Sequence, residues 1–103
     1  MIHSVYFWLK DDLDDPQRAF FREELLRLQE IDYLHSIQVG TPAATAERAG
    51  VTDHSFDYSL VVEFASMKDH DRYQGPDPHH DRFVKEAAPL CQKILVFDSQ
   101  SCG

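Results

Sequence analysis

Each end of the chain holds a predicted strand that is apolar on both of its faces. Residues 1–10 read MIHSVYFWLK, and residues 94–97 read ILVF, so apolar side chains occupy odd and even positions alike. Because successive side chains of a strand point to opposite faces, both faces of these strands have to be covered. One layer of helices covers only one face of a sheet. We therefore expect a second sheet, from another copy of the chain, to cover Tyr6 and Trp8.

The pattern between these ends predicts the element order β-α-β-β-α-β. Strands are expected at residues 1–10, 34–41, 56–64 and 91–99, with helices at 16–31 and, interrupted by GPDP at 75–78, at 66–88. Asp77 is the expected N-cap after this interruption, with Pro78 as the first helical residue. The order is that of the ferredoxin-like α+β fold, an antiparallel sheet with helices on one face. We expect one such domain over residues 1–103.

The first predicted helix carries one apolar stripe. Asp15 is its expected N-cap. On a helical wheel the following residues share one face: Phe20, Phe21, Leu25, Leu28 and Ile31. Leu26 lies off this face, so we expect it to be exposed or to meet another element. The polar, alanine-rich stretch 42–55 is expected to be the most mobile internal loop, with one helical turn at residues 43–49.

Charge and cysteine content exclude several classes of partner. The chain has 103 residues, with 18 acidic against 10 basic residues and a formal net charge of −8. It lacks the basic surface that nucleic acids and anionic membranes require, so neither is an expected partner. Cys91 and Cys102 are too few for a disulfide framework and are expected to be free thiols. No signal-like or membrane-spanning segment is recognisable, and we expect a cytoplasmic protein.

Three segments taken together resemble a known family. They are IHSVYFWLK at residues 2–10, DYSLVVEFAS at 57–66, and the pattern RYQGPDPHHDRFVKE…PL…KILVFDS at 72–99. They combine a His in the first strand, a Tyr before a Pro-x-His turn, and an apolar last strand that ends in Asp. This combination is similar to the stress-responsive A/B barrel (Dabb) family. The resemblance implies a ferredoxin-like fold and a homodimer in which two sheets pack into an α+β barrel.

The resemblance also implies a site. A plant member of the family is a polyketide cyclase that closes a linear substrate by aldol condensation, and its pocket residues match His3, Tyr73 and His80 in this sequence. One extra residue separates Tyr73 from His80 here. Tyr58 and Glu24 stand where the cyclase has a His and a Tyr. The implied catalytic set is therefore His3, His80 and Tyr73, with no cofactor and no metal.

The residues by themselves leave two interpretations of each member of this set. An imidazole among apolar neighbours needs a partner, so His3 is either a structural residue bonded to the last strand or to the Pro-x-His turn, or a base. His80 would lie in the first turn of a helix, whose positive end disfavours imidazolium, and is either a neutral base or a capping and packing residue. Tyr73 is either part of the core or a phenol aimed into a pocket. If the three converge, they form a base and donor set for removing a proton next to a carbonyl.

Metal and thiol chemistry find less support in the sequence. Histidines and acidic residues cluster at Asp69 and His70 and at residues 79–81. Neighbouring side chains on a helix point in different directions, however, and no zinc-binding motif is present. We expect no specific metal site and no nucleophilic role for Cys91.

The leading functional interpretation is a barrel protein with a small apolar pocket in each copy. It would bind, and by acid–base chemistry convert, a small carbonyl or phenolic metabolite. One alternative is a non-enzymatic, stress-linked dimeric barrel with structural histidines. Another, by fold analogy alone, is a cofactor-independent monooxygenase. A pocket of about 300 Å³ or more would favour the first interpretation, and a filled core the second.

Overall fold

The computed structural model describes residues 1–103 and contains four strands and three α-helices in the expected order. The strands are β1 (Ile2–Leu9), β2 (Ser36–Gly40), β3 (Tyr58–Glu63) and β4 (Cys91–Ser99). The α-helices are α1 (Asp15–Arg27), α2 (Met67–Gln74) and α3 (Pro78–Glu86), with 3-10 turns at Leu28–Glu30 and Ala88–Leu90.

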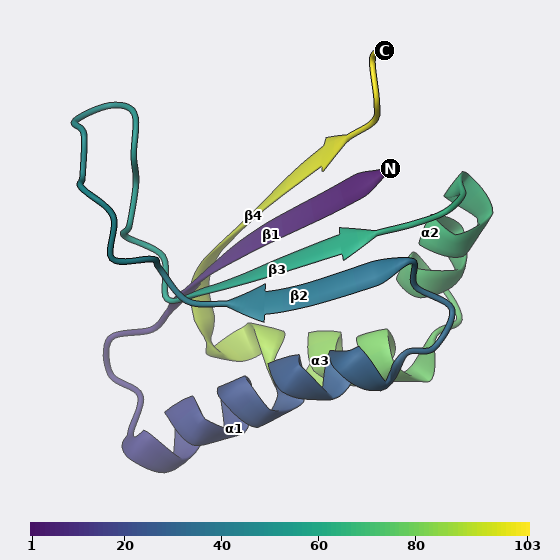
Figure 1. Ribbon diagram of the computed structural model, residues 1–103. Coiled ribbons are helices and arrows are strands. Elements are labelled where there is room, and N and C mark those ends of the chain that lie inside the picture. Colours follow the sequence, from purple (N-terminus) through teal and green to yellow (C-terminus); the bar gives the residue numbers. More distant parts are fainter.

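The strands form one antiparallel sheet in the order β2-β3-β1-β4. Strand β1 is central and pairs with β3 on one side and β4 on the other, while β2 and β4 are the edges. Helices α1 and α3 lie beneath one face of this sheet, and α2 lies near the end of β3 (Figure 1). The predicted ferredoxin-like α+β fold is thereby confirmed.

The hydrophobic core lies between the sheet and the helices. Alternate residues of β1 are buried, beginning with His3, and the residues between them are half-buried. Phe7, Phe21 and Phe83 bring together β1, α1 and α3, with ring centroids 5.4, 5.6 and 5.7 Å apart. The buried apolar core consists of Val5, Phe7, Leu9, Phe21, Leu25, Leu28, Ile31, Leu60, Val62, Phe64, Tyr73, Phe83 and Ala87.

Helix α1 departs from the prediction at both ends. Its N-cap is Asp14, and Asp15 is already helical, because Asp14 and Gln17 close a capping box. The Asp14 carboxylate accepts from the Gln17 amide at 2.8 Å, and the Gln17 side chain accepts from the Asp14 amide at 3.0 Å. The helix gives way to a 3-10 turn at Leu28 rather than continuing to residue 31. Phe20, placed in the apolar stripe, is only half-buried.

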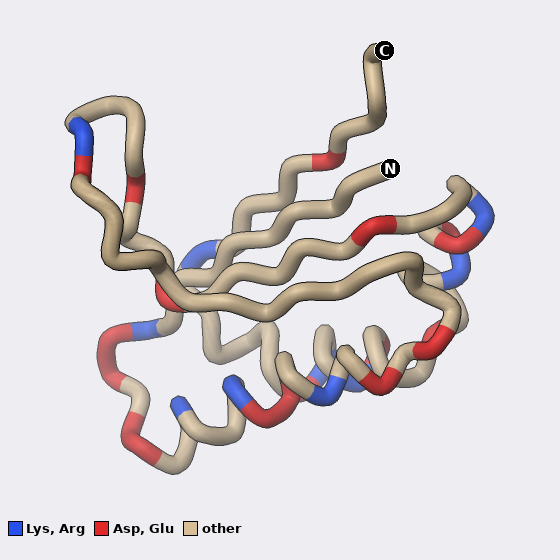
Figure 2. Tube along the Cα trace, in the orientation of Figure 1, with Lys and Arg blue, Asp and Glu red and all other residues tan.

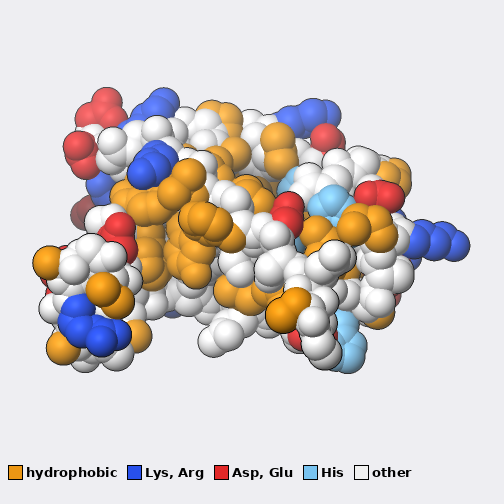
Figure 3. Space-filling model, turned by 90° about the horizontal axis from the view of Figure 1, so that it is seen from above, with side chains coloured by type: hydrophobic (Ala, Val, Ile, Leu, Met, Phe, Trp, Pro, Cys, Tyr) orange, Lys and Arg blue, Asp and Glu red, His pale blue; other side chains and the backbone are white.

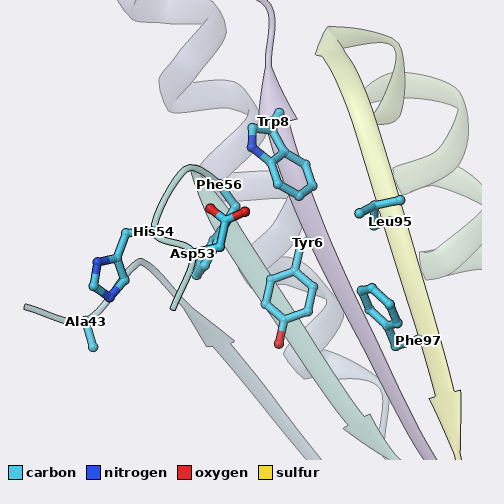
Figure 4. Close-up of a pocket in the computed structure, with 8 residues that line it drawn as sticks. All are labelled: Tyr6, Trp8, Ala43, Asp53, His54, Phe56, Leu95 and Phe97. Atoms are coloured by element: carbon cyan, nitrogen blue, oxygen red, sulfur yellow. The ribbon is translucent and has the colours of Figure 1, made fainter. Parts of the chain in front are cut away.

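The second face of the sheet carries no helix. Tyr6 and Trp8 of β1 lie on this face together with Leu95 and Phe97 of β4 (Figure 4). Phe56, from the loop that precedes β3, lies beside them. Figure 3 views this face of the sheet from above and shows that hydrophobic side chains gather toward one end of the face. They border an open cavity of about 440 Å³. We call the five residues the open-face cluster.

The connection from β2 to β3 is one long loop that stands away from the sheet (Figure 1). The helical turn expected at residues 43–49 does not form. Charged residues concentrate on the helices and connections, and the strands carry only Glu63, Lys93 and Asp98 (Figure 2). None of the helices has the length and apolar character needed to cross a membrane.

Candidate active site

A cavity of about 180 Å³ lies between the helix-facing side of the sheet and helices α2 and α3. Its polar lining residues are His3, Tyr73, Gln74 and His80. Its apolar lining residues are Val5, Phe7, Leu60, Phe83, Val84, Ala88, Ile94 and Val96. The volume is smaller than the roughly 300 Å³ typical of ligand sites. Edge strand β4 is not covered by a helix, so Ile94 and Val96 remain partly exposed at one side of the cavity, with 39% and 48% of their surface accessible.

The break between α2 and α3 places Tyr73 and His80 against each other. Helix α2 ends at Gly75, and α3 begins after its N-cap Asp77, whose carboxylate accepts from the amides of His79 at 2.8 Å and His80 at 3.0 Å. The chain therefore turns between the two helices. The rings of Tyr73 and His80 lie with their centroids 4.1 Å apart.

Tyr33 contacts the segment between α2 and α3 through Asp77. Its hydroxyl donates to Asp77 Oδ2 at 2.6 Å, and the Arg72 guanidinium lies 3.9 Å from the centre of its ring. Burial by itself would raise the pKa of the Asp77 carboxyl. The hydrogen bonds from Tyr33 and from the two amides together outweigh burial, so the pKa lies below the ordinary value. The N-terminus of α3 is thus capped by an ionised carboxylate.

His3 reaches the cavity from β1 and is bonded to the end of β4. The register pairs His3 with Asp98 across the two strands, and His3 Nδ1 donates to Asp98 Oδ1 at 2.6 Å. Because the carboxylate occupies Nδ1–H, Nε2 carries the free lone pair. The sequence-based alternative in which His3 bonds to the last strand is therefore the observed geometry. The same bond also orients His3 as an acceptor, so it is compatible with both interpretations.

The environment of Tyr73 and His80 favours their neutral forms. Burial is the main reason that the pKa of His80 is lowered, and the nearby His3 adds to this effect. Burial, followed by the charge of Asp77, raises the pKa of the Tyr73 phenol. A hydrogen bond between the His80 ring and the Tyr73 backbone opposes the lowering of the His80 pKa in part. The Tyr73 hydroxyl makes no hydrogen bond, and no polar side-chain atom is both enclosed and unpaired, so this hydroxyl keeps contact with accessible space.

The three residues named from the sequence come together in one cavity, and the extra residue before His80 does not separate them. The Tyr73 ring lies 5.8 Å from the His3 ring and 4.1 Å from the His80 ring, centroid to centroid. Glu24 and Tyr58 do not line this cavity. Glu24 instead binds Arg82 through two hydrogen bonds of 2.9 and 3.0 Å.

Asp98 and His70 were not among the site residues chosen from the sequence. Asp98 orients His3, and the His70 ring lies 6.1 Å from the His3 ring. The final Asp of the last strand was part of the family pattern, but only the strand register brings it opposite His3. His70 belongs to one of the histidine and acidic clusters noted in the sequence, but nothing in the sequence places it near His3.

Comparison with solved structures supports the fold. A hydroxynitrile lyase from Passiflora edulis is 26% identical, with a TM-score of 0.72 over 93% of this chain and 87% of that chain. A Dabb family protein from Mesorhizobium loti is 21% identical, with a TM-score of 0.73 over 99% of this chain and 96% of that chain. A dimeric ferredoxin-like protein of unknown function from Jannaschia sp. CCS1 is 19% identical, with a TM-score of 0.74 over 97% of each chain.

No curated protein matches the chain. The family model described as the stress responsive A/B barrel domain matches residues 1–101, which is nearly the whole sequence. The strand order and the helix-covered face described above (Figure 1) agree with the resemblance found in the sequence. The chain therefore belongs to the stress-responsive A/B barrel (Dabb) family.

Proposed function

We propose that the protein binds a small carbonyl or phenolic metabolite in the cavity formed by His3, Tyr73 and His80, and converts it by acid–base chemistry. The observation that carries this proposal is the convergence of these polar groups in a mainly apolar cavity. The Tyr73 hydroxyl has no protein partner, which leaves it free to bind a ligand oxygen.

Each residue has a distinct part in the proposed chemistry. His80, kept neutral by burial, accepts a proton from a phenol or from the carbon next to a carbonyl. Tyr73, whose phenol stays protonated, donates a hydrogen bond to the oxygen on which negative charge develops. His3 Nε2, oriented by Asp98, is a second acceptor within the same cavity.

The similarity to an enzyme adds support. The Passiflora edulis structure is named a hydroxynitrile lyase, and it is 26% identical to this chain. An enzyme built on the same fold at this level of similarity favours a catalytic use of the cavity. It does not identify the substrate, because one fold hosts many activities.

The cavity size favours a second candidate function. At about 180 Å³ it leaves room for a ligand smaller than most metabolites. The bond from His3 to Asp98 is also what a structural histidine would make. The alternative proposal is a non-enzymatic, stress-linked dimer in which these histidines stabilise the fold.

The replacement His80→Ala distinguishes the two, with His79→Ala as the matched control. His79 is its neighbour on α3 and does not line the cavity. Cyclohexanone probes conversion, through deuterium uptake at the carbon next to its carbonyl. Resorcinol probes binding, through NMR chemical-shift changes. We expect His80→Ala to abolish both signals without changing the melting temperature, and His79→Ala to keep them.

The non-enzymatic alternative predicts other results. Neither probe would give a signal with the unmodified protein, and His80→Ala would lower the free energy of unfolding by about 1–3 kcal/mol.

We further propose that the chain forms a homodimer through the open-face cluster. This face exposes apolar side chains over both β1 and β4, and several similar structures are described as dimeric. A second copy would supply the layer that the helices do not provide.

A further inference from the structure

His3, His70 and Asp98 form a cluster beside the cavity. They come from β1, α2 and β4, and one ligand atom from each lies within 4.8 Å of the other two. His3 is buried, His70 is half-buried, and Asp98 is exposed at the end of its strand. Two imidazoles and one carboxylate are a donor set that Zn²⁺ and similar divalent ions bind, leaving positions for water.

The His70 ring is oriented for such a role. Its Nδ1 lies 3.1 Å from Asp71 Oδ1, and because an ionised carboxylate only accepts, Nδ1 donates and Nε2 carries the lone pair. Metal-binding histidines are held in this way by a carboxylate on the second nitrogen. The ring also packs edge-on against Phe64, with centroids 5.4 Å apart, which limits its rotation.

We propose that His3, His70 and Asp98 bind a divalent transition metal ion, with Zn²⁺ as the reference ion, and that Asp71 orients His70 for this purpose. This site goes beyond the function proposed above. The ion would take the place of the proton that His3 Nδ1 and Asp98 Oδ1 share at 2.6 Å. His3 Nε2 would then carry the hydrogen, so that His80 is the acceptor of the cavity in the metal-bound form. Two ligand atoms of a tetrahedral zinc ion lie about 3.4 Å apart. The distance between His3 Nδ1 and Asp98 Oδ1 therefore has to increase slightly, and the longest distance within the cluster, up to 4.8 Å, has to decrease. Asp98 can follow because its side chain is 45% exposed.

The test measures metal binding and not turnover, so its failure can be distinguished from a failure of the acid–base proposal. Protein without a histidine tag is titrated with Zn²⁺ by calorimetry, and with Co²⁺ by its visible absorption. We expect one ion per chain. We expect His70→Gln and Asp98→Asn to weaken binding by at least about tenfold, and Asp71→Asn to weaken it by about tenfold.

His35→Gln is the matched control. His35 lies 3.5 Å from Glu63 and forms a histidine–carboxylate pair of the same type on the surface, outside the three-residue cluster. The His35→Gln variant should bind the ion as tightly as the unmodified protein. Circular dichroism checks that each variant is folded, and Asp98→Asn keeps an oxygen that can accept from His3. The proposal is overturned if the unmodified protein shows no saturable one-to-one binding, or if His70→Gln binds as tightly as His35→Gln.

Discussion

Tyr73 combines almost complete burial with an unpaired hydroxyl. The residue is 1% exposed, and its ring packs against His3, Phe64 and His80. A core position of this kind could be filled by phenylalanine without loss of packing. The hydroxyl therefore makes no hydrogen bond that stabilises the single chain.

We expect Tyr73→Phe to leave the free energy of unfolding within about 0.5 kcal/mol of the original, because no hydrogen bond is lost. Binding of resorcinol should weaken by about 1–3 kcal/mol, because the ligand oxygen loses its donor. Chemical denaturation and calorimetric titration measure the two quantities. A large loss of stability with unchanged binding would show that the hydroxyl is structural.

The sequence predicts the cavity residues better than their partners. Alternation along residues 1–10 places His3 on the buried face, and the GPDP break brings His80 back over the sheet beside Tyr73. Both signals are local. The bond from His3 to Asp98 depends on the pairing of the first strand with the last, and the approach of His70 depends on the path of α2. Strand order and helix placement are set by packing of the whole chain, which periodicity does not encode.

Among the elements, α1 and α3 are joined by a buried carboxylate. Glu24 is 3% exposed, and Arg82 donates to both of its oxygens. These hydrogen bonds are the largest reason that the pKa of Glu24 is lowered, and they outweigh the effect of its burial. Removing Arg82 alone would leave this carboxylate buried, with only Arg27 nearby at 3.6 Å.

Arg82→Met is expected to lower the free energy of unfolding by about 1–3 kcal/mol at pH 7, less than for a fully buried pair because Arg82 is half-exposed. A carboxyl whose pKa is lowered by folding stabilises the protein above its unfolded pKa, and this contribution is lost as the pH falls. The difference between Arg82→Met and the original should therefore shrink below about pH 4. Urea denaturation of the variant and the original protein, at pH 7 and below about pH 4, measures this difference in the free energy of unfolding.

Lys85→Met is the control for this pair. Lys85 binds Asp81 at 2.9 Å on the exposed surface of the same helix. Its loss should cost only about 0.3–0.5 kcal/mol. If Arg82→Met costs no more than this, or if its cost does not depend on pH, the pair does not have the assigned role.

The loop between β2 and β3 should exchange its amide hydrogens faster than any other internal segment. Within residues 42–55 only the amides of Val51, Thr52 and Ser55 donate hydrogen bonds, and most of these residues are exposed. Unbonded, exposed amides exchange without unfolding of the sheet. Hydrogen exchange followed by NMR tests this, and protection equal to that of β1 would contradict it.

Element types follow from the sequence more closely than their ends. Strand β4 has the predicted bounds, and Asp77 caps α3 as expected, because an Asp-Pro pair is a strong local start signal. Strands β2 and β3 are shorter than predicted, because the residues just outside them keep only single hydrogen bonds to the neighbouring strands, such as those from the His35 amide to the Glu63 carbonyl and from the Asp57 amide to the Phe7 carbonyl. The alanine-rich loop forms no helical turn because it has no apolar face to pack against the core.

At the scale of the whole molecule, the sheet is covered on one face only. The open-face cluster includes Phe97, which is 58% exposed, and Leu95, which is 38% exposed. Trp8 lies beneath Lys93, with the ammonium 4.6 Å from its ring, and donates to Ser55 Oγ at 3.0 Å. Apolar surface of this extent on one face is typical of an interface with another protein.

We expect the protein to be a twofold-symmetric dimer in solution, and Phe97→Glu to convert it to a folded monomer. A glutamate at this exposed position is tolerated in the single chain, but in the dimer it would be buried without a partner. Leu26→Glu is the control, because Leu26 is 37% exposed on α1, away from the open face. Light scattering at micromolar concentration gives the mass. Trp8, the only tryptophan, reports burial through its fluorescence. An original protein that is monomeric with an exposed Trp8, or a Phe97→Glu variant that stays dimeric, would show that the open face is not the interface.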